Sequence, residues 1–299
     1  MRKRDLLTLR DLTAGEIHGL LGRAAALKQA RLIGQRTHTL PGKILGMIFE
    51  KPSTRTRVSF EVGMVELGGH AVYLAPEGSQ IGRGEPVADT ARVLSSYCHG
   101  IVIRTFAQSR LAELARYSTV PVINGLTDFS HPCQVLADLF TTLELLGGLE
   151  GVRFAWIGDG NNMANAWIDA AGILGLDLVV ACPQGYDPDP AALARTPSVR
   201  VVRDPAEAAR AADVLSTDVW ASMGQETEAA ARRTAFAGYC LDDAMLTQSS
   251  SRSIVLHCLP AHRGEEISEA VLEGPRSAVW RQAENRLHTQ KAILELFLG

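Results

Sequence analysis

The chain has 299 residues, which is enough for two domains of ordinary size. Hydrophobic residues make up 46% of it and charged residues 21%, so two cores can be buried and a disordered chain is excluded. The formal net charge of −3 argues against a broad basic surface for nucleic acid. Any cluster of cations must therefore be local.

The first residues and the cysteines predict a cytoplasmic protein. Residues 1–17 carry charges but no apolar segment of signal-peptide length, and nowhere do 18 apolar residues follow one another, so we expect neither secretion nor a membrane span. No CxxC pair occurs, which predicts neither a disulfide framework nor a zinc ribbon. The five cysteines are Cys98, Cys133, Cys182, Cys240 and Cys258.

Short apolar segments alternate with helical patterns along the chain. Strands are predicted at residues 43–49, 70–74, 100–104, 120–123, 152–158, 177–182, 199–202, 213–217 and 253–258. Helices are predicted at residues 54–67, 87–98, 109–117, 133–146, 161–174, 205–212, 226–236 and 264–273. This alternation predicts an α/β fold with two domains, each a mostly parallel sheet flanked by helices.

The glycines of residues 145–151 (LLGGLEG) are the best boundary signal, because they end one helix before a new strand begins. A last helix, from about residue 280 to 298, follows the break at Gly274 and Pro275 and could pack on either half. Ligands of open parallel sheets bind beyond the carboxyl ends of the strands. We therefore expect the functional residues to follow strands directly.

The segment FEKPSTRTR (49–57) lies between a predicted strand and a predicted helix. Ser53 is a suitable N-cap, and the first turn then presents backbone N–H groups, the hydroxyls of Thr54 and Thr56, and the guanidinium group of Arg55. The helix dipole and these donors together favour a bound anion. The alternative is an ordinary capped helix with solvated arginines.

Three later features could complete such an anion site. The glycine-rich segment 78–85 (GSQIGRGE), which contains Gln80, is either a loop that closes over a ligand or a plain surface loop. Arg104 ends a predicted strand, where it either faces the ligand or pairs with a carboxylate. His131 stands at a helix entrance and could donate to a carbonyl oxygen or carry a proton, although a lone histidine is more often structural.

The second half has its own strand-end residues. The segment GDGNNMAN (158–165) resembles half of a dinucleotide fingerprint, but its asparagines suit a small carboxylate better than a pyrophosphate. Asp218 follows the predicted strand 213–217 and matches a cationic group such as an ammonium. Its alternative role is the N-cap of the next helix.

The segment HCLPAHRG (257–264) also follows a strand. The bond between Leu259 and Pro260 is a candidate cis peptide in a tight turn. His257, Cys258 and His262 raise the possibility of zinc, but their spacing is not that of a closed zinc site. We therefore expect no metal there.

Taken together, these segments resemble the transcarbamylase family, and specifically its ornithine carbamoyltransferase branch. The likeness extends over nearly the whole chain and keeps the family's order. The segments that carry it are FEKPSTRTRVSFE (49–61), GSQIGRGEPVADTARVLS (78–95), DFSHPCQVLAD (128–138), GDGNNMANAW (158–167), DVWASMGQE (218–226), LHCLPAHRGEEI (256–267) and AENRLHTQKA (283–292).

The resemblance implies a domain at residues 1–147 that binds carbamoyl phosphate, with the helix at 280–299 returning to it, and a domain at 148–279 that binds ornithine. It also implies a homotrimer with shared active sites, to which Gln80 of a neighbouring subunit contributes, and no metal or other cofactor. The residues implied for the donor are Ser53, Thr54, Arg55, Thr56, Gln80, Arg104, His131, Gln134, Cys258, Leu259 and Arg286. Those implied for ornithine are Asn162, Asp218, Ser222 and Met223.

The catalytic residues implied by the resemblance are Arg104, His131 and Cys258. Arg104 and His131, with Thr56, would stabilise the oxyanion of a tetrahedral intermediate. Ornithine's amine is itself the nucleophile, but only roughly one molecule in a thousand is neutral at pH 7 if its pKa is near that of lysine. We expect Asp218 to hold the α-ammonium while Cys258 helps to orient and deprotonate the side-chain amine.

Three other interpretations of the sequence compete with that of an ornithine-specific transcarbamylase. A transcarbamylase for putrescine, an acylated ornithine or aspartate is the nearest, although putrescine has no carboxylate for Asn162 and aspartate would want cations where Asp218 stands. A nucleotide-dependent dehydrogenase is disfavoured because the third glycine of the fingerprint is missing. A solute-binding protein would need an export signal, which we do not find.

Overall fold

The computed structural model describes residues 3–75, 84–221 and 226–299. Its contacts divide the chain into two compact units, one of Met1–Phe140 with Glu284–Gly299 and the other of Thr141–Ala283. The first division falls within helix α5 (Pro132–Leu146), whereas the sequence predicted it at the end of that helix.

The first unit contains a four-stranded parallel sheet in the order β2-β1-β3-β4. Phe49 at the end of β1 pairs with Arg104 at the end of β3, so the segments that follow these two strands leave the sheet at the same edge. The strands are β1 (Ile44–Phe49), β2 (His70–Leu74), β3 (Gly100–Arg104) and β4 (Val122–Leu126).

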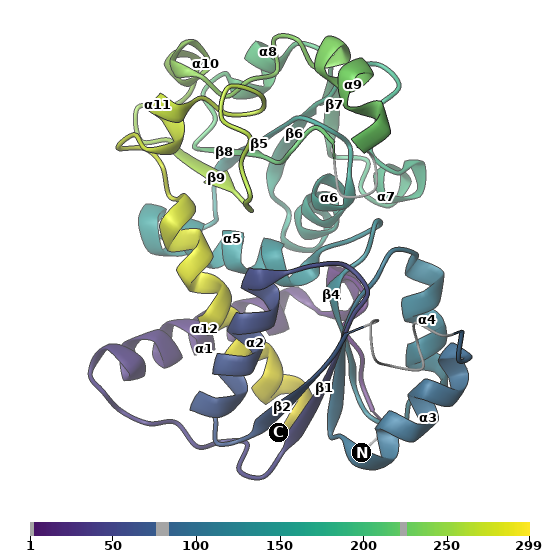
Figure 1. Ribbon diagram of the computed structural model, residues 1–299. Helices are drawn as coiled ribbons and strands as arrows, with labels where there is room; N and C mark the ends of the chain where they lie inside the picture. Colours follow the sequence, from purple (N-terminus) through teal and green to yellow (C-terminus); the bar gives the residue numbers. More distant parts are fainter. Residues whose placement is uncertain (1–2, 76–83, 222–225) are drawn as a thin grey trace. The chain divides into compact units, whose positions relative to one another are not determined.

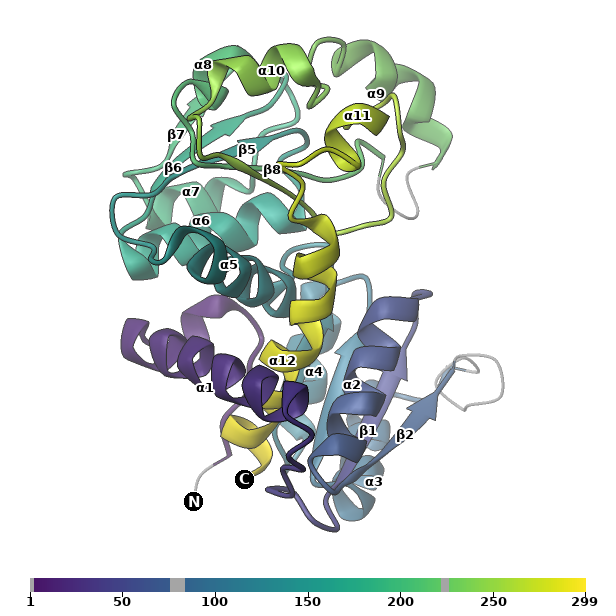
Figure 2. The same ribbon diagram turned by 90° about the vertical axis from the view of Figure 1, so that its left-hand side faces the viewer.

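Helices cover both faces of this sheet (Figures 1 and 2). One face carries α3 (Val87–Tyr97) and α4 (Gln108–Tyr117), whose apolar side chains pack on β1, β3 and β4. The other face carries α1 (Ala14–Leu32), α2 (Thr54–Glu66) and much of α12 (Val279–Leu298). Both faces are thus buried, as a parallel sheet requires.

The second unit contains a five-stranded parallel sheet in the order β7-β6-β5-β8-β9. Helices α6 and α7 lie on one face, and α8, α9, α10 and α11 lie on the other (Figures 1 and 2). The strands are β5 (Arg153–Ile157), β6 (Asp177–Ala181), β7 (Arg200–Val202), β8 (Val214–Thr217) and β9 (Ile254–His257). The helices are α6 (Asn162–Leu174), α7 (Pro190–Arg195), α8 (Pro205–Ala209), α9 (Ala229–Ala235), α10 (Asp243–Gln248) and α11 (Glu269–Leu272), and short 3-10 turns occur at η1 (Leu9–Asp11) and η3 (Glu226–Glu228).

The predicted α/β fold is confirmed, and each predicted strand is present with small differences at its ends. Three helices were not predicted: α1, α7 and α10. The helix predicted at 264–273 is wrong over its first half, because only Glu269–Leu272 is helical. Gly264, with a φ of 86°, belongs instead to a turn in which its N–H donates to the carbonyl oxygen of Ile267.

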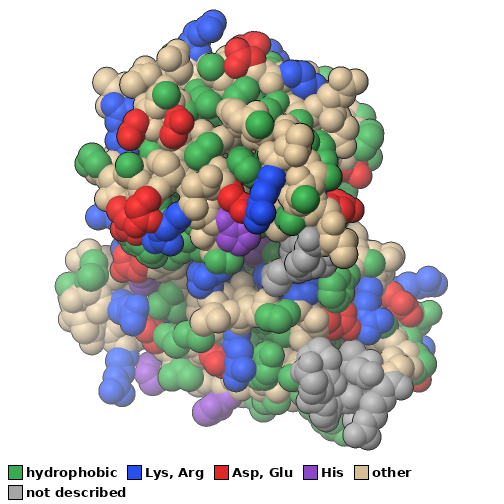
Figure 3. Space-filling view, turned by 45° about the horizontal axis from the view of Figure 1, so that its top comes forward, with side chains coloured by type: hydrophobic (Ala, Val, Ile, Leu, Met, Phe, Trp, Pro, Cys, Tyr) green, Lys and Arg blue, Asp and Glu red, His purple; other side chains and the backbone are tan. Residues whose placement is uncertain are grey.

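Charged side chains of both signs are interspersed on the face of the molecule in Figure 3. This matches the formal net charge of −3. Among the described residues, no helix has the length and apolar character needed to cross a membrane.

His288 on α12 should make the protein sensitive to acid. Burial, and then the nearby charges of Lys28, Lys291 and Arg31, lower the pKa of His288 to about 3. The pKa of histidine in an unfolded chain is about 6.5. Below that pH, His288 therefore becomes protonated in the unfolded chain while it stays neutral in the folded chain. Stability is therefore lost as the pH falls from about 6.5 towards about 3.

We expect His288→Gln to lose about 2 kcal/mol less free energy of unfolding than the parent between pH 6.5 and pH 5. Urea unfolding of both proteins at the two pH values measures this difference. An equal loss in the two proteins would show that His288 is protonated as readily in the folded chain as in the unfolded one.

Candidate active site

In the first unit, the first turn of α2 forms the helix entrance predicted from the STRTR motif. Ser53 is the N-cap, and its side-chain oxygen accepts a hydrogen bond from the Thr56 N–H at 3.2 Å. Thr54 is exposed, Arg55 is half-buried and Thr56 is buried. Because the leading N–H groups of a helix favour negative charge, this turn offers an anion both main-chain and side-chain donors.

Arg286 on α12 contacts both this turn and α5. Its Nη2 donates to Thr56 Oγ1 at 3.1 Å, and its Nη1 donates to Gln134 Oε1. Gln134 Nε2 in turn donates to Asp138 Oδ1 at 2.9 Å. Arg286 and Gln134 are each only 2% exposed. The structure thus brings together three residues that lie far apart in the sequence but were predicted for one site.

His131 lies among the arginines of the same unit. Burial, and then the charges of Arg286, Arg104 and Arg55, hold the pKa of His131 well below its usual value. Its Nδ1 has no hydrogen-bond partner within the described part of the chain. At neutral pH the ring is therefore an uncharged imidazole, which suits it to hydrogen-bond a carbonyl group rather than to act as a cationic acid.

The strand ends around Arg104 are held by buried polar contacts. Arg104 is the last residue of β3 and is 6% exposed, and its carbonyl oxygen accepts from the Glu50 N–H at 2.8 Å. Lys51, also buried, forms an ion pair with Asp128 and lies 4.3 Å from the centre of the Phe106 ring. The charge of Lys51 is thus matched locally, so we assign the anion-binding part of the motif to the residues after it.

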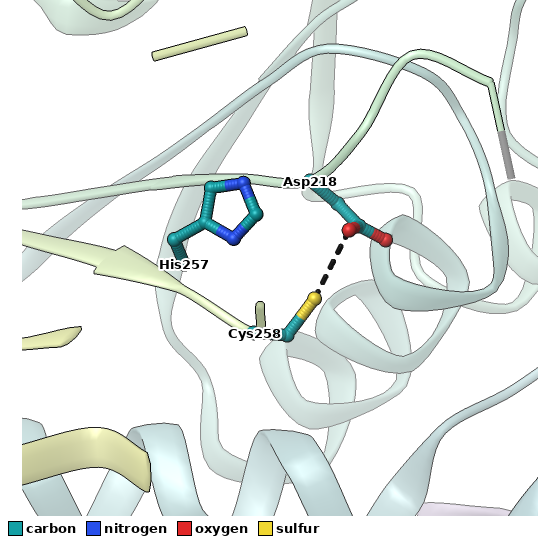
Figure 4. A group of neighbouring side chains, drawn as sticks. All are labelled: Asp218, His257 and Cys258. Atoms are coloured by element: carbon teal, nitrogen blue, oxygen red, sulfur yellow. Dashed lines mark hydrogen bonds between the residues drawn. The ribbon is translucent and has the colours of Figure 1, made fainter. Parts of the chain in front are cut away.

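In the second unit, Asp218 and Cys258 face each other across the ends of β8 and β9 (Figure 4). The Cys258 thiol donates to Asp218 Oδ1 at 3.0 Å. Oδ1 also accepts from the Val219 N–H at 2.8 Å, and Oδ2 accepts from Asn161 Nδ2 at 3.1 Å. Asp218 is 9% exposed, so this carboxylate is both oriented and largely shielded from water.

The entrance of α6 lies beside this carboxylate. Asn161 is the N-cap of α6, and its side-chain oxygen accepts from the N–H groups of Met163 and Ala164 while its amide nitrogen donates to Asp218. Asn162, the first residue of the helix, is 9% exposed. Asn161 was not predicted as a site residue, although asparagine is among the preferred N-caps.

His257 fixes the turn that carries Cys258 and Leu259. Its Nδ1 accepts from the Leu259 N–H at 2.9 Å, which places the ring proton on Nε2, where Glu266 Oε1 lies at 3.0 Å. Leu259 has a φ of 59°, a region that residues other than glycine seldom adopt, and the bond that follows it to Pro260 is cis, as predicted. The main chain at Leu259 is thus held by the buried histidine.

The metal possibility can be tested on these contacts. Asp218, His257 and Cys258 offer ligand atoms that all lie within 4.8 Å of one another. The sequence instead suggested His262 as the neighbour of His257 and Cys258. Both ring nitrogens of His257 are already engaged, with Leu259 and Glu266. A metal ion bound here would have to displace one of those contacts.

Three predicted site residues lie outside the described residues: Gln80, Ser222 and Met223. The remaining predicted residues form one group in each unit. The group of the first unit is Ser53, Thr54, Arg55, Thr56, Arg104, His131, Gln134 and Arg286, and that of the second unit is Asn162, Asp218, Cys258 and Leu259.

Two family models match successive parts of the chain. Residues 4–144 match the model of the carbamoyl-P binding domain of aspartate/ornithine carbamoyltransferases, and residues 150–297 match that of their Asp/Orn binding domain. The ornithine carbamoyltransferase of Geobacter sulfurreducens is 57% identical over 296 residues, covering 97% of this chain and 98% of the relative.

Solved structures give the same result. The ornithine carbamoyltransferase from Pyrococcus furiosus is 50% identical, with a TM-score of 0.95 over 99% of this chain and 97% of that one. The enzyme from Thermus thermophilus is 44% identical, with a TM-score of 0.91 over 100% of both chains. The chain therefore belongs to the aspartate/ornithine carbamoyltransferase family.

Proposed function

We propose that this protein transfers the carbamoyl group of carbamoyl phosphate to the side-chain amine of L-ornithine, giving L-citrulline and phosphate. The observation that carries the proposal is the cluster of Arg55, Arg104 and Arg286 around the neutral His131 in a chain with a negative net charge. Carbamoyl phosphate combines a dianionic phosphate with a neutral carbamoyl group. A cationic cluster around an uncharged hydrogen-bonding ring matches both parts.

In this proposal the first unit holds the donor. The N–H groups at the entrance of α2, with Ser53, Thr54 and Arg55, bind the phosphate, and Gln134 binds the carbamoyl amide. Thr56, Arg104 and His131 donate to the carbonyl oxygen as it gains charge. Arg286 is already oriented by two hydrogen bonds, so little reorganisation is needed when negative charge develops on the leaving phosphate.

The second unit holds the acceptor in the same proposal. The α-ammonium of ornithine is matched by the Asp218 carboxylate, and its carboxylate is matched by Asn162 with Ser222 and Met223. Cys258 and Leu259 lie beside the side-chain amine. The thiol donates to Asp218, so its sulfur is held in place and can accept a hydrogen bond from the amine and orient it.

Aspartate is the second acceptor that the family name allows. Its side chain would bring a further carboxylate to the acceptor site, where Asp218 already supplies one. Two carboxylates close together repel each other unless one is protonated. The Asp218 carboxylate therefore favours ornithine, which brings an ammonium.

The direct test is an assay of citrulline formation from ornithine and carbamoyl phosphate in the presence of a chelator. We expect citrulline at an undiminished rate when EDTA is added. No citrulline without EDTA would overturn the proposed reaction, and loss of activity with EDTA that returns on adding a divalent metal would overturn the metal-independent mechanism.

Replacing Cys258 by alanine is expected to lower kcat at least about tenfold while KM for carbamoyl phosphate changes little, because the thiol acts on the amine. The rate of the parent should rise above pH 7 as more amine becomes neutral. Steady-state kinetics at pH 6–9 measure both effects. A raised KM for carbamoyl phosphate with an unchanged kcat would contradict the role given to Cys258.

We further propose that the protein works in the cytoplasm as a homotrimer, in which Gln80 of each subunit reaches the donor bound to a neighbour. The family membership supports this arrangement. Light scattering of the purified protein measures its mass, and mixing Gln80→Ala subunits with Arg55→Ala subunits tests the sharing. Activity recovered on mixing is the expected result, and none recovered would contradict shared sites.

A further inference from the structure

Arg232 of α9 lies in the second unit and connects the segments that carry the acceptor-binding residues. Its Nη1 donates to Asp159 Oδ2 at 3.0 Å and to the carbonyl oxygen of Trp220 at 2.9 Å. Its Nε donates to Glu228 Oε2 at 3.0 Å. The side chains of Arg232 and Asp159 are only 8% and 10% exposed, so this is a buried ion pair.

A cluster of aromatic side chains, Tyr186, Phe236 and Trp220, lies beside Arg232. The guanidinium carbon of Arg232 lies 5.0 Å from the centre of the Tyr186 ring. Trp220 stacks on Phe236, with 5.6 Å between ring centres and 19° between planes. The carbonyl oxygen of Asp159 accepts from Trp156 Nε1 at 2.8 Å, so the Asp159 main chain is held as well.

Two of the segments that Arg232 contacts bear a proposed acceptor-binding group close by. Asp159 precedes Asn161 and Asn162 in the turn between β5 and α6, and Trp220 follows Asp218 by two residues. These two segments also meet directly, through the hydrogen bond from Asn161 to Asp218. Arg232 therefore closes a loop of contacts in which the Asp218 carboxylate is one member.

We propose that the buried pair of Arg232 and Asp159 is a positioning pair for the acceptor amino acid. It holds the Trp220 main chain and the β5–α6 turn at the spacing at which the Asp218 carboxylate accepts hydrogen bonds from both Asn161 and Cys258. The proposal rests on the proposed function, because it concerns the affinity for ornithine. The pair itself need not touch either substrate.

The pair should also respond to pH. Burial raises the pKa of Asp159 to about 6, against the opposing effect of Arg232 and with a smaller contribution from Asp218. Besides these two, the Cys182 thiol is a titratable neighbour of Asp159, and Glu228 shares the guanidinium. As the pH falls through about 6, Asp159 takes up a proton and the ion pair is lost.

The test compares the parent with Asp159→Asn and Arg232→Lys at pH 7.5. We expect Asp159→Asn to raise KM for ornithine about tenfold, within the range for residues that share one hydrogen-bonded network, with KM for carbamoyl phosphate unchanged. Arg232→Lys keeps the charge but has one nitrogen in place of the Nη1 and Nε that bond Asp159, Trp220 and Glu228, so its KM for ornithine should lie between those of the parent and Asp159→Asn.

A pH series separates positioning from a general loss of structure. KM for ornithine in the parent should rise between pH 7.5 and pH 5.5, and this rise should be smaller in Asp159→Asn. Circular dichroism and the KM for carbamoyl phosphate report whether each variant is folded. If Asp159→Asn proves unfolded, Arg232→Lys carries the test.

The outcomes are distinct. An active parent with unchanged ornithine KM in the folded variants overturns the positioning role alone, as does equal weakening of both substrates. A parent that forms no citrulline overturns the proposed function instead.

Discussion

Replacing Arg55 by alanine is expected to lower kcat/KM for carbamoyl phosphate on the order of a hundredfold to a thousandfold. Arg55 lies half-buried in the first turn of α2, and its charge acts on His131. In the proposed reaction it meets the phosphate as the carbamoyl bond breaks and negative charge moves onto the leaving group. Losing it removes one charge-assisted contact that strengthens in the transition state.

The matched control is Arg116→Ala, an exposed arginine in the last turn of α4. It changes the net charge by the same amount, so a general electrostatic effect would appear in both variants. We expect kcat/KM to stay within about twofold of the parent in the control. Equal losses in the two variants would mean that Arg55 acts only through the overall charge.

Replacing Asp218 by asparagine is expected to lower kcat/KM for ornithine about a hundredfold, since a hydrogen-bonded charge that meets a charged ligand contributes up to about 3 kcal/mol. The carboxylate accepts from Cys258, Val219 and Asn161, whereas an amide offers one acceptor oxygen and a donor group. Both the charge and the orientation of the thiol would change. Steady-state kinetics with ornithine as the varied substrate measure the effect.

Asp177→Asn is the control for this variant. Asp177 is an exposed aspartate at the start of β6, paired with Arg153 at 3.4 Å, and lies at the other end of the strands of the same sheet. We expect it to keep the parent's kinetics. If Asp218→Asn also bound ornithine normally, Asp218 would have no part in binding the acceptor, and its contacts with Cys258, Val219 and Asn161 would be structural only.

The fold was predictable because both sheets are parallel. Strands buried on both faces are continuous apolar segments, such as residues 100–104, which are easily recognised between helical patterns. Helix α1 was not predicted, since it is rich in alanine and glycine and its apolar side is weakly marked. Its capping box of Thr13 and Glu16 was the available signal.

The candidate site was predictable where a residue's own segment indicates its role. Ser53 and Arg55 follow a strand and begin a helix. The N-terminus of a helix favours a bound anion through its own N–H groups, so this role can be predicted from the local sequence alone. Arg286 sits in the middle of a helix, and its contact with Thr56 joins residues 230 apart in the sequence. Only the family resemblance pointed to it.

The supporting contacts could not be predicted from local pattern. Arg232 and Asp159 are 73 residues apart, and nothing in the sequence around either one indicates that it pairs with the other. Their pairing follows from how α9 packs beside the β5–α6 turn, which depends on the tertiary fold. The same holds for Glu266, whose buried carboxylate fixes His257 and thereby the turn at Cys258.

The site of donor binding is tested by a crystal structure of the protein soaked with a phosphonate analogue of carbamoyl phosphate. We expect the phosphonate at the first turn of α2, within hydrogen-bonding distance of the Thr54 to Thr56 N–H groups and of the Arg55 guanidinium. Saturating analogue with no density at that turn, or a phosphonate bound elsewhere with Arg55 turned away, would contradict it.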